Sequence, residues 1–221
     1  MLELINISKR YKDKWVLKDI HMKLNEERCV GILGVNGSGK TTLLSILAGV
    51  LKPNSGKVMY SDVDLLKNQT LRRKLIAYIP QKSPLIEELN ALDNLKLWYD
   101  KEELKKEISS GVISLLGVDE FLKKPVSALS MGMKKRLSIA CAVANKPKIL
   151  LMDEPSAYLD IICKADIHRY ISEHKRQGGS IILVSHDVGD FTVCDEHYVL
   201  KSGVLSPFEY KDNVDELIKK L

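Results

Sequence analysis

The 221-residue chain contains little cysteine, proline or aromatic residue, with 4 Cys, 7 Pro, 2 Trp and 3 Phe. No two cysteines have the close spacing of a zinc or dithiol motif, which predicts reduced and mostly buried thiols. No apolar run approaches the roughly 18 to 20 residues that cross a bilayer, and the first residues lack the pattern of a secretory signal. We therefore expect a globular protein of the cytosol.

A strong excess of charge of one sign is also missing. The 34 Lys and Arg residues are balanced by 29 Asp and Glu, which leaves a formal net charge of +5 spread along the chain. This balance favours anionic partners such as nucleotides only mildly. Apolar residues make up 45% of the chain, enough for a sizeable core, and the length predicts one large domain or a domain with an insertion.

The order of the apolar patterns predicts an α/β fold. Residues 2–7 and 15–24 have the pattern of two strands that pair antiparallel near the N-terminus. Three later runs, 29–33, 149–152 and 180–184, are short and mostly apolar, which is typical of parallel strands buried on both faces. Residues 76–79 are a further short strand candidate, and helices are expected at 41–51 and 161–176.

Residues 82–128 change character and have a helical pattern. Leu92, Leu95 and either Trp98 or Tyr99 fall on one stripe of a helix, and the following stretch is dense in Lys and Glu. A helical insertion is therefore expected between two parts of the α/β fold. A last amphipathic helix is expected at 213–221, where Val214, Leu217, Ile218 and Leu221 share a face.

The segment from Gly34 to Thr41 reads Gly-Val-Asn-Gly-Ser-Gly-Lys-Thr and matches the phosphate-binding loop of nucleoside triphosphatases. It lies between a predicted buried strand and a predicted helix, as that motif requires. Backbone N–H groups of such a loop surround the phosphates, Lys40 supplies a positive charge, and Thr41 offers an oxygen to Mg²⁺. The predicted nucleotide contacts are Gly34, Asn36, Gly37, Ser38, Gly39, Lys40, Thr41 and Thr42.

Two acids, Asp153 and Glu154, directly follow the apolar run 149–152. They would emerge at the carboxyl end of a strand, where α/β sheets bind ligands. Asp153 suits Mg²⁺, and Glu154 suits polarisation of the water that attacks the γ-phosphate. The plain alternative is that Asp153 caps the next segment and Glu154 is a solvated acid. A guanine site would need Asn-Lys-x-Asp, but residues 145–148 end in Lys, which argues against a GTPase.

Residues 129–136, Leu-Ser-Met-Gly-Met-Lys-Lys-Arg, resemble the signature motif of ABC ATPases. Tyr11 matches the aromatic residue that stacks on adenine in that family, Gln81 the Gln loop, and His186 the switch histidine. The resemblance covers essentially the whole chain. It implies a P-loop NTPase core of mostly parallel sheet, with an N-terminal antiparallel β subdomain and a helical insertion. The single domain 1–221 would then divide into a catalytic core, 1–81 and 129–221, and a helical subdomain, 82–128.

The resemblance also implies a role for each matched residue. Tyr11 would stack on the base, while Gln81 would bind Mg²⁺ or the attacking water and link it to the helical insertion. His186 would bond the γ-phosphate and hold the water against Glu154. Considered alone, Tyr11 could be an ordinary aromatic residue at a strand end, Gln81 a loop amide and His186 a structural histidine.

Ser130 and Gly132 would contact an ATP held by the phosphate loop of another subunit. The resemblance therefore implies a head-to-tail homodimer, or a heterodimer with another ABC ATPase subunit, that encloses two ATP molecules. Met131 and Met133 depart from the commonest signature, Leu-Ser-Gly-Gly-Gln, and Tyr158 replaces a usually small residue.

The implied function is that of the ATP-binding and ATP-hydrolysing subunit of an ABC transporter, with ATP and Mg²⁺ as ligands. Separate membrane-spanning permease subunits would hold it at the inner face of the cell membrane, with Leu85, Ile86 and Leu89 lining the docking groove. The form of the signature favours export, and no nucleic acid partner is expected. Two alternatives stay open: a soluble ABC ATPase acting on DNA, the ribosome or cofactor assembly, and a phosphotransferase.

Overall fold

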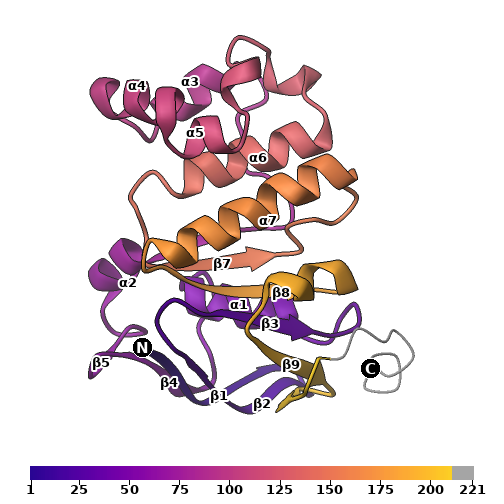
Figure 1. Ribbon diagram of the computed structural model, residues 1–221. Coiled ribbons are helices and arrows are strands. Elements are labelled where there is room, and N and C mark those ends of the chain that lie inside the picture. Colours follow the sequence, from indigo (N-terminus) through magenta and orange to yellow (C-terminus); the bar gives the residue numbers. More distant parts are fainter. Residues whose placement is uncertain (211–221) are drawn as a thin grey trace.

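The computed structural model describes residues 1–210, which form two β-sheets with helices around the larger sheet (Figure 1). The smaller sheet is antiparallel and has the order β2-β1-β4-β5. Its strands are β1 (Leu2–Tyr11), β2 (Lys14–Leu24), β4 (Ser55–Tyr60) and β5 (Val63–Asp64). The antiparallel pairing predicted near the N-terminus is confirmed, with Leu2 opposite Leu24.

The larger sheet has the order β10-β9-β3-β8-β7-β6 and is parallel from β9 to β6. Its strands are β3 (Cys29–Leu33), β6 (Ile76–Ile79), β7 (Ile149–Asp153), β8 (Ser180–Ser185), β9 (Glu196–Lys201) and β10 (Val204–Pro207). Every residue of β3, β7 and β8 is buried, as their continuous apolar runs predict. The carboxyl ends of these three adjacent strands meet at one edge of the sheet, where the site lies.

Seven α-helices and three 3₁₀ helices fall within residues 1–210. The α-helices are α1 (Lys40–Ala48), α2 (Gln69–Leu75), α3 (Ala91–Lys96), α4 (Lys101–Ser110), α5 (Val112–Leu115), α6 (Met131–Ala142) and α7 (Ile161–Arg176). The 3₁₀ helices are η1 (Asp119–Phe121), η2 (Val126–Ala128) and η3 (Val188–Val193). Figure 1 shows α3, α4 and α5 at one end of the molecule and the antiparallel sheet at the other, with α6 and α7 between them.

Helix α1 is shorter than the predicted 41–51 and ends at Ala48. Gly49 takes a left-handed conformation, with φ 76°, and its N–H bonds the carbonyl groups of Ile46 and Ser45, which terminates the helix. On the predicted stripe of the insertion, Tyr99 is buried and its hydroxyl donates to the Ala140 carbonyl at 2.6 Å. Trp98 is 56% exposed, and both residues follow α3, which ends at Lys96; Tyr99 therefore packs from the turn after the helix and not from its apolar stripe.

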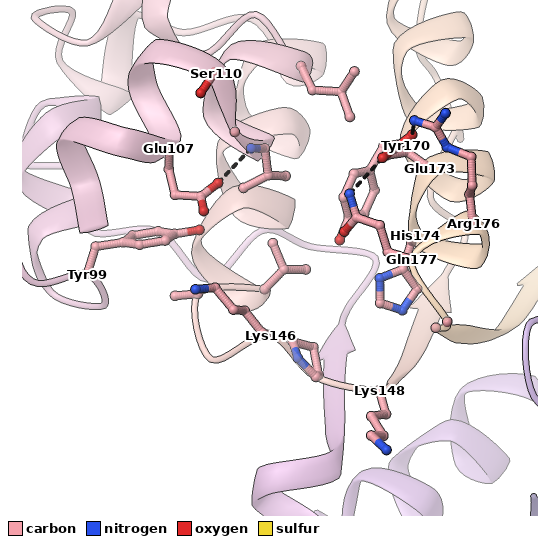
Figure 2. A pocket seen from close by; sticks show the side chains of 18 residues that line it. Tyr99, Glu107, Ser110, Lys146, Lys148, Tyr170, Glu173, His174, Arg176 and Gln177 are labelled. Atoms are coloured by element: carbon pink, nitrogen blue, oxygen red, sulfur yellow. Dashed lines mark hydrogen bonds and ion pairs between the residues drawn. The ribbon is translucent and has the colours of Figure 1, made fainter. Parts of the chain in front are cut away.

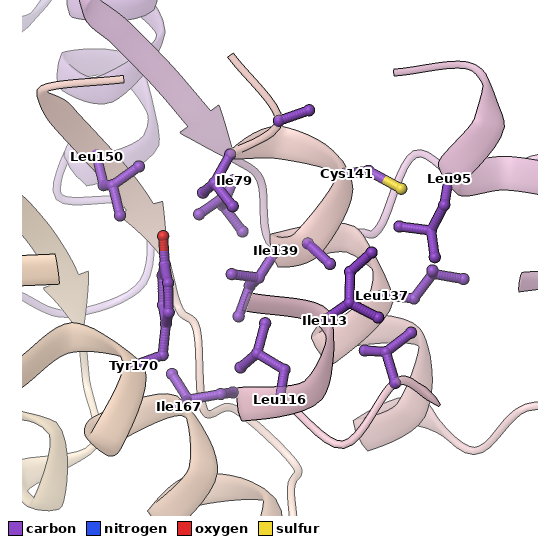
Figure 3. Close-up of a cluster of buried hydrophobic side chains, with 14 of the residues drawn as sticks. Ile79, Leu95, Ile113, Leu116, Leu137, Ile139, Cys141, Leu150, Ile167 and Tyr170 are labelled. Carbon is purple, nitrogen blue, oxygen red and sulfur yellow. The ribbon is translucent and has the colours of Figure 1, made fainter. Parts of the chain in front are cut away.

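Two apolar clusters fill the fold on either side of the parallel sheet. One joins α1 and the strands of both sheets, through residues such as Leu4, Leu43 and Ile182. The other joins the insertion to α6, α7 and the opposite face of the parallel sheet (Figure 3), through residues such as Leu95 and Ile139. The helices predicted within 82–128 therefore pack on the rest of the chain, with α6 at the centre of the contact.

The cysteines are free, and Cys29, Cys141 and Cys163 are buried, as predicted. Within residues 1–210, no helix is both long and apolar enough to cross a membrane. The helix predicted at 213–221 lies outside the described residues.

Candidate functional site

The predicted phosphate loop connects the buried strand β3 to helix α1. Gly39 is the N-cap of α1, and its φ of 109° is a conformation that favours glycine. A Cβ at Gly34 would lie 2.5 Å from Oγ of Ser38 and 2.9 Å from the Leu200 carbonyl, so a larger residue would disrupt the loop. The loop therefore has the compact backbone that lets N–H groups approach phosphate oxygens closely.

Lys40 begins α1 and is buried. Its Nζ donates to the carbonyl of Gly34 at 2.6 Å and lies 3.4 Å from Oε1 of Glu154. Both side chains of this ion pair are 6% exposed, so the charges are desolvated and interact strongly. The structure thus places the predicted lysine and the predicted second acid against each other.

Asp153 is the last residue of β7 and lies near Thr41 in the first turn of α1. The Tyr78 hydroxyl, from the neighbouring strand β6, donates to Oδ2 of Asp153 at 3.1 Å. Burial raises the pKa of Asp153, while hydrogen bonds from Thr41 and Tyr78 act in the opposite direction. Burial, together with the charge of Asp153, raises the pKa of Tyr78 to about 12. Tyr78 is consequently a neutral donor that orients the carboxylate.

Glu154 follows β7 in a left-handed conformation, with φ 48°, which is rare for a residue with a side chain. Its N–H donates to the Val184 carbonyl of β8 at 2.9 Å. Oε2 accepts a hydrogen bond from the backbone N–H of His186 at 3.2 Å and lies 2.7 Å from Nδ1 of the same residue. Glu154 and His186, two of the predicted catalytic residues, therefore contact each other directly across adjacent strand ends.

The donor set fits a magnesium ion bound together with phosphate. Buried oxygen atoms without a hydrogen-bond partner include Asp153 Oδ1 and Ser38 Oγ. Mg²⁺ is usually held by one or two carboxylates, a hydroxyl, substrate phosphates and water. The hydroxyl of Thr41 and the carboxylate of Asp153 supply such a pair. Within residues 1–210 there is no cluster of three or more His, Cys, Asp or Glu side chains that could hold a metal by itself.

Tyr11 ends β1 and is 48% exposed, as a side chain that is to stack on a base must be. Lys9 Nζ lies 5.4 Å from the centre of its ring. Val16 lies near the start of β2, the second strand of this hairpin. It packs closely on Gly39 of the phosphate loop, since a Cβ added at Gly39 would lie only 2.9 Å from Cγ1 of Val16. Val16 thus links the hairpin to the phosphate loop, a contact that the sequence pattern did not reveal.

Gln81 lies just after β6 and is exposed. Its backbone carbonyl and that of Pro80 each accept a hydrogen bond from Nζ of Lys135 on α6, at 2.9 Å. Burial lowers the pKa of Lys135 to about 8, and the negative charges of Asp153 and Glu154 act in the opposite direction. The sequence did not single out Lys135, because its partners lie 55 and 54 positions away along the chain.

The signature segment forms the start of α6. Ser130 is its N-cap and accepts a hydrogen bond from the N–H of Met133 at 3.2 Å. A Cβ at Gly132 would lie 2.4 Å from Sγ of Cys163 on α7, so this glycine also serves helix packing. Neither Ser130 nor Gly132 forms a hydrogen bond with the phosphate loop in the part of the chain that the structure describes.

Lys164 of α7, a residue that the sequence did not single out, contacts the loop that follows His186. Asp187 pairs with Lys164, and this hydrogen bond lowers the pKa of Asp187. Oδ1 of Asp187 also accepts a hydrogen bond from the N–H of Gly189 at 2.9 Å. These contacts anchor the backbone immediately after the histidine.

A hollow of about 760 Å³ lies elsewhere, between the insertion and α7 (Figure 2). It contains none of the predicted site residues. Some charged groups on its wall pair within the chain: Lys146 contacts Glu103 at 2.8 Å, and Arg176 pairs with Glu173. The predicted site residues lie at the strand ends and not in this hollow.

A P-loop nucleoside triphosphatase is the class that this fold and this set of residues define. The family model described as "ABC transporter" matches residues 17–157, and the chain belongs to that family. The predicted family and the predicted α/β P-loop fold are both confirmed.

The chain is similar to three curated ABC ATP-binding proteins. It is 35% identical over 211 residues to the spermidine/putrescine import ATP-binding protein PotA of Spiroplasma citri, covering 93% of this chain and 60% of PotA. It is 34% identical over 214 residues to YybJ of Bacillus subtilis, covering 95% and 96%. It is 29% identical over 226 residues to the lipopolysaccharide export protein LptB of Haemophilus influenzae, covering 98% and 94%. The chain thus spans about three fifths of the length of PotA.

A solved structure described as a post-hydrolysis state of the dimeric ATP-binding cassette MJ0796 bound to ADP and Pi superposes with a TM-score of 0.84. It is 27% identical and covers 96% of this chain and 100% of its own. A nucleotide-free cassette from an ABC transporter, 23% identical with a TM-score of 0.84, shares the fold. The description of MJ0796 names ADP and Pi, the products of ATP hydrolysis, as the ligands of that cassette.

Proposed function

We propose that this chain binds and hydrolyses ATP as the energy-supplying subunit of an ABC transporter. One observation carries this proposal: Lys40, Glu154 and His186 form a connected group at the carboxyl ends of β3, β7 and β8. This grouping supports a site in which a cation, a carboxylate and an imidazole would face the end of a triphosphate bound on the phosphate loop.

The phosphate loop would bind the triphosphate through its backbone N–H groups and Lys40. Lys40 would then exchange its bond to the Gly34 carbonyl for one to a phosphate oxygen, which is a stronger charge-assisted bond. Tyr11 would stack on adenine from the end of β1. The remaining proposed contacts come from the loop and the first turn of α1: Gly34, Asn36, Gly37, Ser38, Gly39, Thr41 and Thr42.

Thr41, Asp153 and Gln81 are the proposed holders of Mg²⁺. Bound there, the ion would withdraw negative charge from the phosphate oxygens and so favour attack on the γ-phosphate. Asp153 is held in place for this task by the Tyr78 hydroxyl. Gln81 would reach the same region from the end of β6.

Glu154 is the proposed general base. Its buried carboxylate would accept the proton of the attacking water, and the histidine that contacts Oε2 would orient that water and bond the γ-phosphate. Because a carboxylate accepts hydrogen bonds, Nδ1 of His186 would carry the hydrogen in this contact, which would leave Nε2 available to the substrate.

We further propose that two ATP-binding subunits, identical or different, associate head to tail. Ser130 and Gly132 would then contact the triphosphate on the other subunit's phosphate loop. The exposure of Ser130 and Met131 at the N-terminal end of α6 supports this arrangement, as does the description of MJ0796 as a dimer.

The partners in the membrane would be separate permease subunits, which would hold the chain at the inner face of the membrane. Ile86, in the segment after Gln81, is 43% exposed, and Asn94 of α3 bonds both its backbone N–H and its carbonyl. Ile86, with Leu85 and Leu89, forms the proposed docking site. The form of the signature segment supports export, while the names of the relatives include both import and export.

Two measurements test this function on the full chain. Phosphate release from ATP in the presence of Mg²⁺, with no phosphorylated acceptor, is expected; a phosphorylated acceptor would instead identify a phosphotransferase. Cysteine crosslinking from Ile86→Cys is expected to capture a co-purified permease, with an exposed position on α4 such as Lys105→Cys as control. Absence of crosslinks in every nucleotide state would contradict the transport partner and favour a soluble ABC ATPase.

A further inference from the structure

Three consecutive basic residues at the start of α6 reach three different parts of the protein. Lys134 Nζ contacts Oε1 of Glu87 at 2.8 Å, and Arg136 Nη1 donates to the Leu116 carbonyl at 3.0 Å. Lys135, between them, points to the end of β6. Successive residues of a helix are about 100° apart, which explains why the three side chains diverge.

Lys135 differs from its neighbours in burial and in the groups it bonds. It is 4% exposed, and Nζ donates to the carbonyl oxygens of both Pro80 and Gln81 at 2.9 Å. An ammonium group is buried only at a cost, which bonds of this kind offset. The pair made by Lys134 is solvent-exposed on the Glu87 side, and such pairs contribute little.

We propose that Lys135 is a positioning residue that fixes the loop carrying Gln81 to the first turns of α6. This inference rests on the proposed ATPase function and adds a residue to it. Ser130 caps the same helix about 7.5 Å further along its axis, so one rigid element holds both the Gln81 loop and the signature segment. A shift of α6 would consequently move Gln81 and Ser130 together, coupling the water-binding side of one site to the surface that meets the other subunit.

The first test compares Lys135→Met with Lys134→Met in the full chain, by steady-state ATP hydrolysis. Lys135→Met is expected to lower kcat about tenfold with KM for ATP within about twofold, since the loop is displaced but the phosphate loop is intact. Lys135→Arg, which keeps a charged donor, is expected to restore part of kcat. Lys134→Met is the matched control and is expected to leave both parameters unchanged. An unchanged kcat in Lys135→Met would overturn the proposal.

A double-mutant cycle separates positioning from a general loss of structure. If Lys135 acts through Gln81, Lys135→Met is expected to have less than a twofold effect on kcat once Gln81→Ala is already present. If the effects of Lys135→Met and Gln81→Ala on kcat simply multiply in the double variant, Lys135 acts elsewhere and the proposal is overturned.

Amide hydrogen exchange on nucleotide-free protein gives a readout that does not depend on activity. Exchange in peptides that cover residues 79–85 is expected to be faster in Lys135→Met than in Lys134→Met, and equal rates would contradict the proposal. Lys135→Gln, a smaller change, takes the place of Lys135→Met if that variant does not fold. A wild-type chain that releases no phosphate would refute the proposed function, whereas the exchange data would still decide the role of Lys135.

Discussion

Nδ1 of His186 lies 2.7 Å from Oε2 of Glu154, and the backbone N–H of His186 donates to the same oxygen. The two residues follow adjacent parallel strands, β7 and β8, and are therefore brought together by the sheet itself. Glu154 meets Lys40 through its other oxygen. One buried carboxylate thus links the phosphate-loop lysine to the histidine.

Glu154→Gln is expected to abolish turnover and preserve ATP binding. The amide keeps the size of the side chain but cannot take a proton from water, and general-base catalysis typically contributes about 10² to 10⁴ in rate. ATP should then hold the two subunits together, which light scattering would show as a stable dimer. Phosphate release measures the first effect, with the exposed Glu102→Gln as control. A variant that hydrolyses ATP at the wild-type rate would remove Glu154 from its assigned role.

Lys40→Ala is expected to weaken ATP binding itself. The side chain would lose a charge-assisted bond to phosphate, worth about 1.5–3 kcal/mol, which is roughly a tenfold or larger rise in Kd. Titration calorimetry measures this directly, with Lys105→Ala on the exposed face of α4 as control. Equal affinities of the two variants would show that Lys40 serves only its bonds within the loop.

The parts of the site that the sequence predicted are those whose chemistry follows from local order along the chain. A glycine-rich loop after β3, two acids after β7 and a histidine after β8 all emerge at one edge because parallel strands end together. Tyr78 and Lys135 were not predicted. Tyr78 contacts a residue 75 positions away along the chain, and Lys135 contacts one 55 positions away. Such contacts depend on how elements pack, which neither periodicity nor motif spacing encodes.

In the fold, too, some elements could be predicted from the local sequence and others could not. The buried strands were predicted from continuous apolar runs, whereas α2 was not, because it is short and has only Leu71 and Leu75 on its apolar side. Asn68 begins it by accepting a hydrogen bond from the N–H of Leu71 at 3.0 Å. Arg72, which is buried on this helix, donates a hydrogen bond to the Leu65 carbonyl at 3.1 Å. Contacts with the rest of the chain therefore stabilise α2, which the helical propensity of its residues alone would not.

Tyr78→Phe is expected to weaken the binding of ATP with Mg²⁺ and to leave Mg²⁺-free nucleotide binding unchanged. The hydroxyl bond to Asp153 is worth about 1 kcal/mol, or roughly a fivefold rise in Kd, and it acts through the proposed metal-holding carboxylate. Affinities measured with Mg²⁺ and with a chelator separate the two cases. Tyr60→Phe, on the antiparallel sheet, is the control. An equal loss under both conditions would show that Tyr78 supports the loop and not the metal.

His174 is expected to make the protein less stable in mild acid. Burial lowers its pKa from 6.5 to about 4, so below pH 6.5 the unfolded chain gains a proton at this side chain that the folded chain does not. Its contribution to the free energy of unfolding is therefore fully present above pH 6.5 and is lost as the pH falls toward 4. The loss amounts to about 3 kcal/mol. Urea unfolding of wild type, His174→Phe and the exposed His21→Gln measures it; a wild-type pH dependence retained in His174→Phe would contradict this assignment.

Gly132→Ala is expected to destabilise the packing of α6 on α7. The added Cβ would lie 2.4 Å from Sγ of Cys163, and overpacking of this kind costs about 1–3 kcal/mol. Cys163→Ala removes the sulfur, so the cost of Gly132→Ala in that background should fall by more than 0.5 kcal/mol, a coupling that urea unfolding can resolve. Gly189→Ala is the control, because a Cβ there meets only Oδ1 of Asp187, at 3.3 Å. If Gly132 were required only for close approach of a phosphate, its substitution would reduce hydrolysis and leave the free energy of unfolding unchanged. A double effect, on stability through Cys163 and on hydrolysis in both backgrounds, is what the position of Gly132 at the start of α6 predicts.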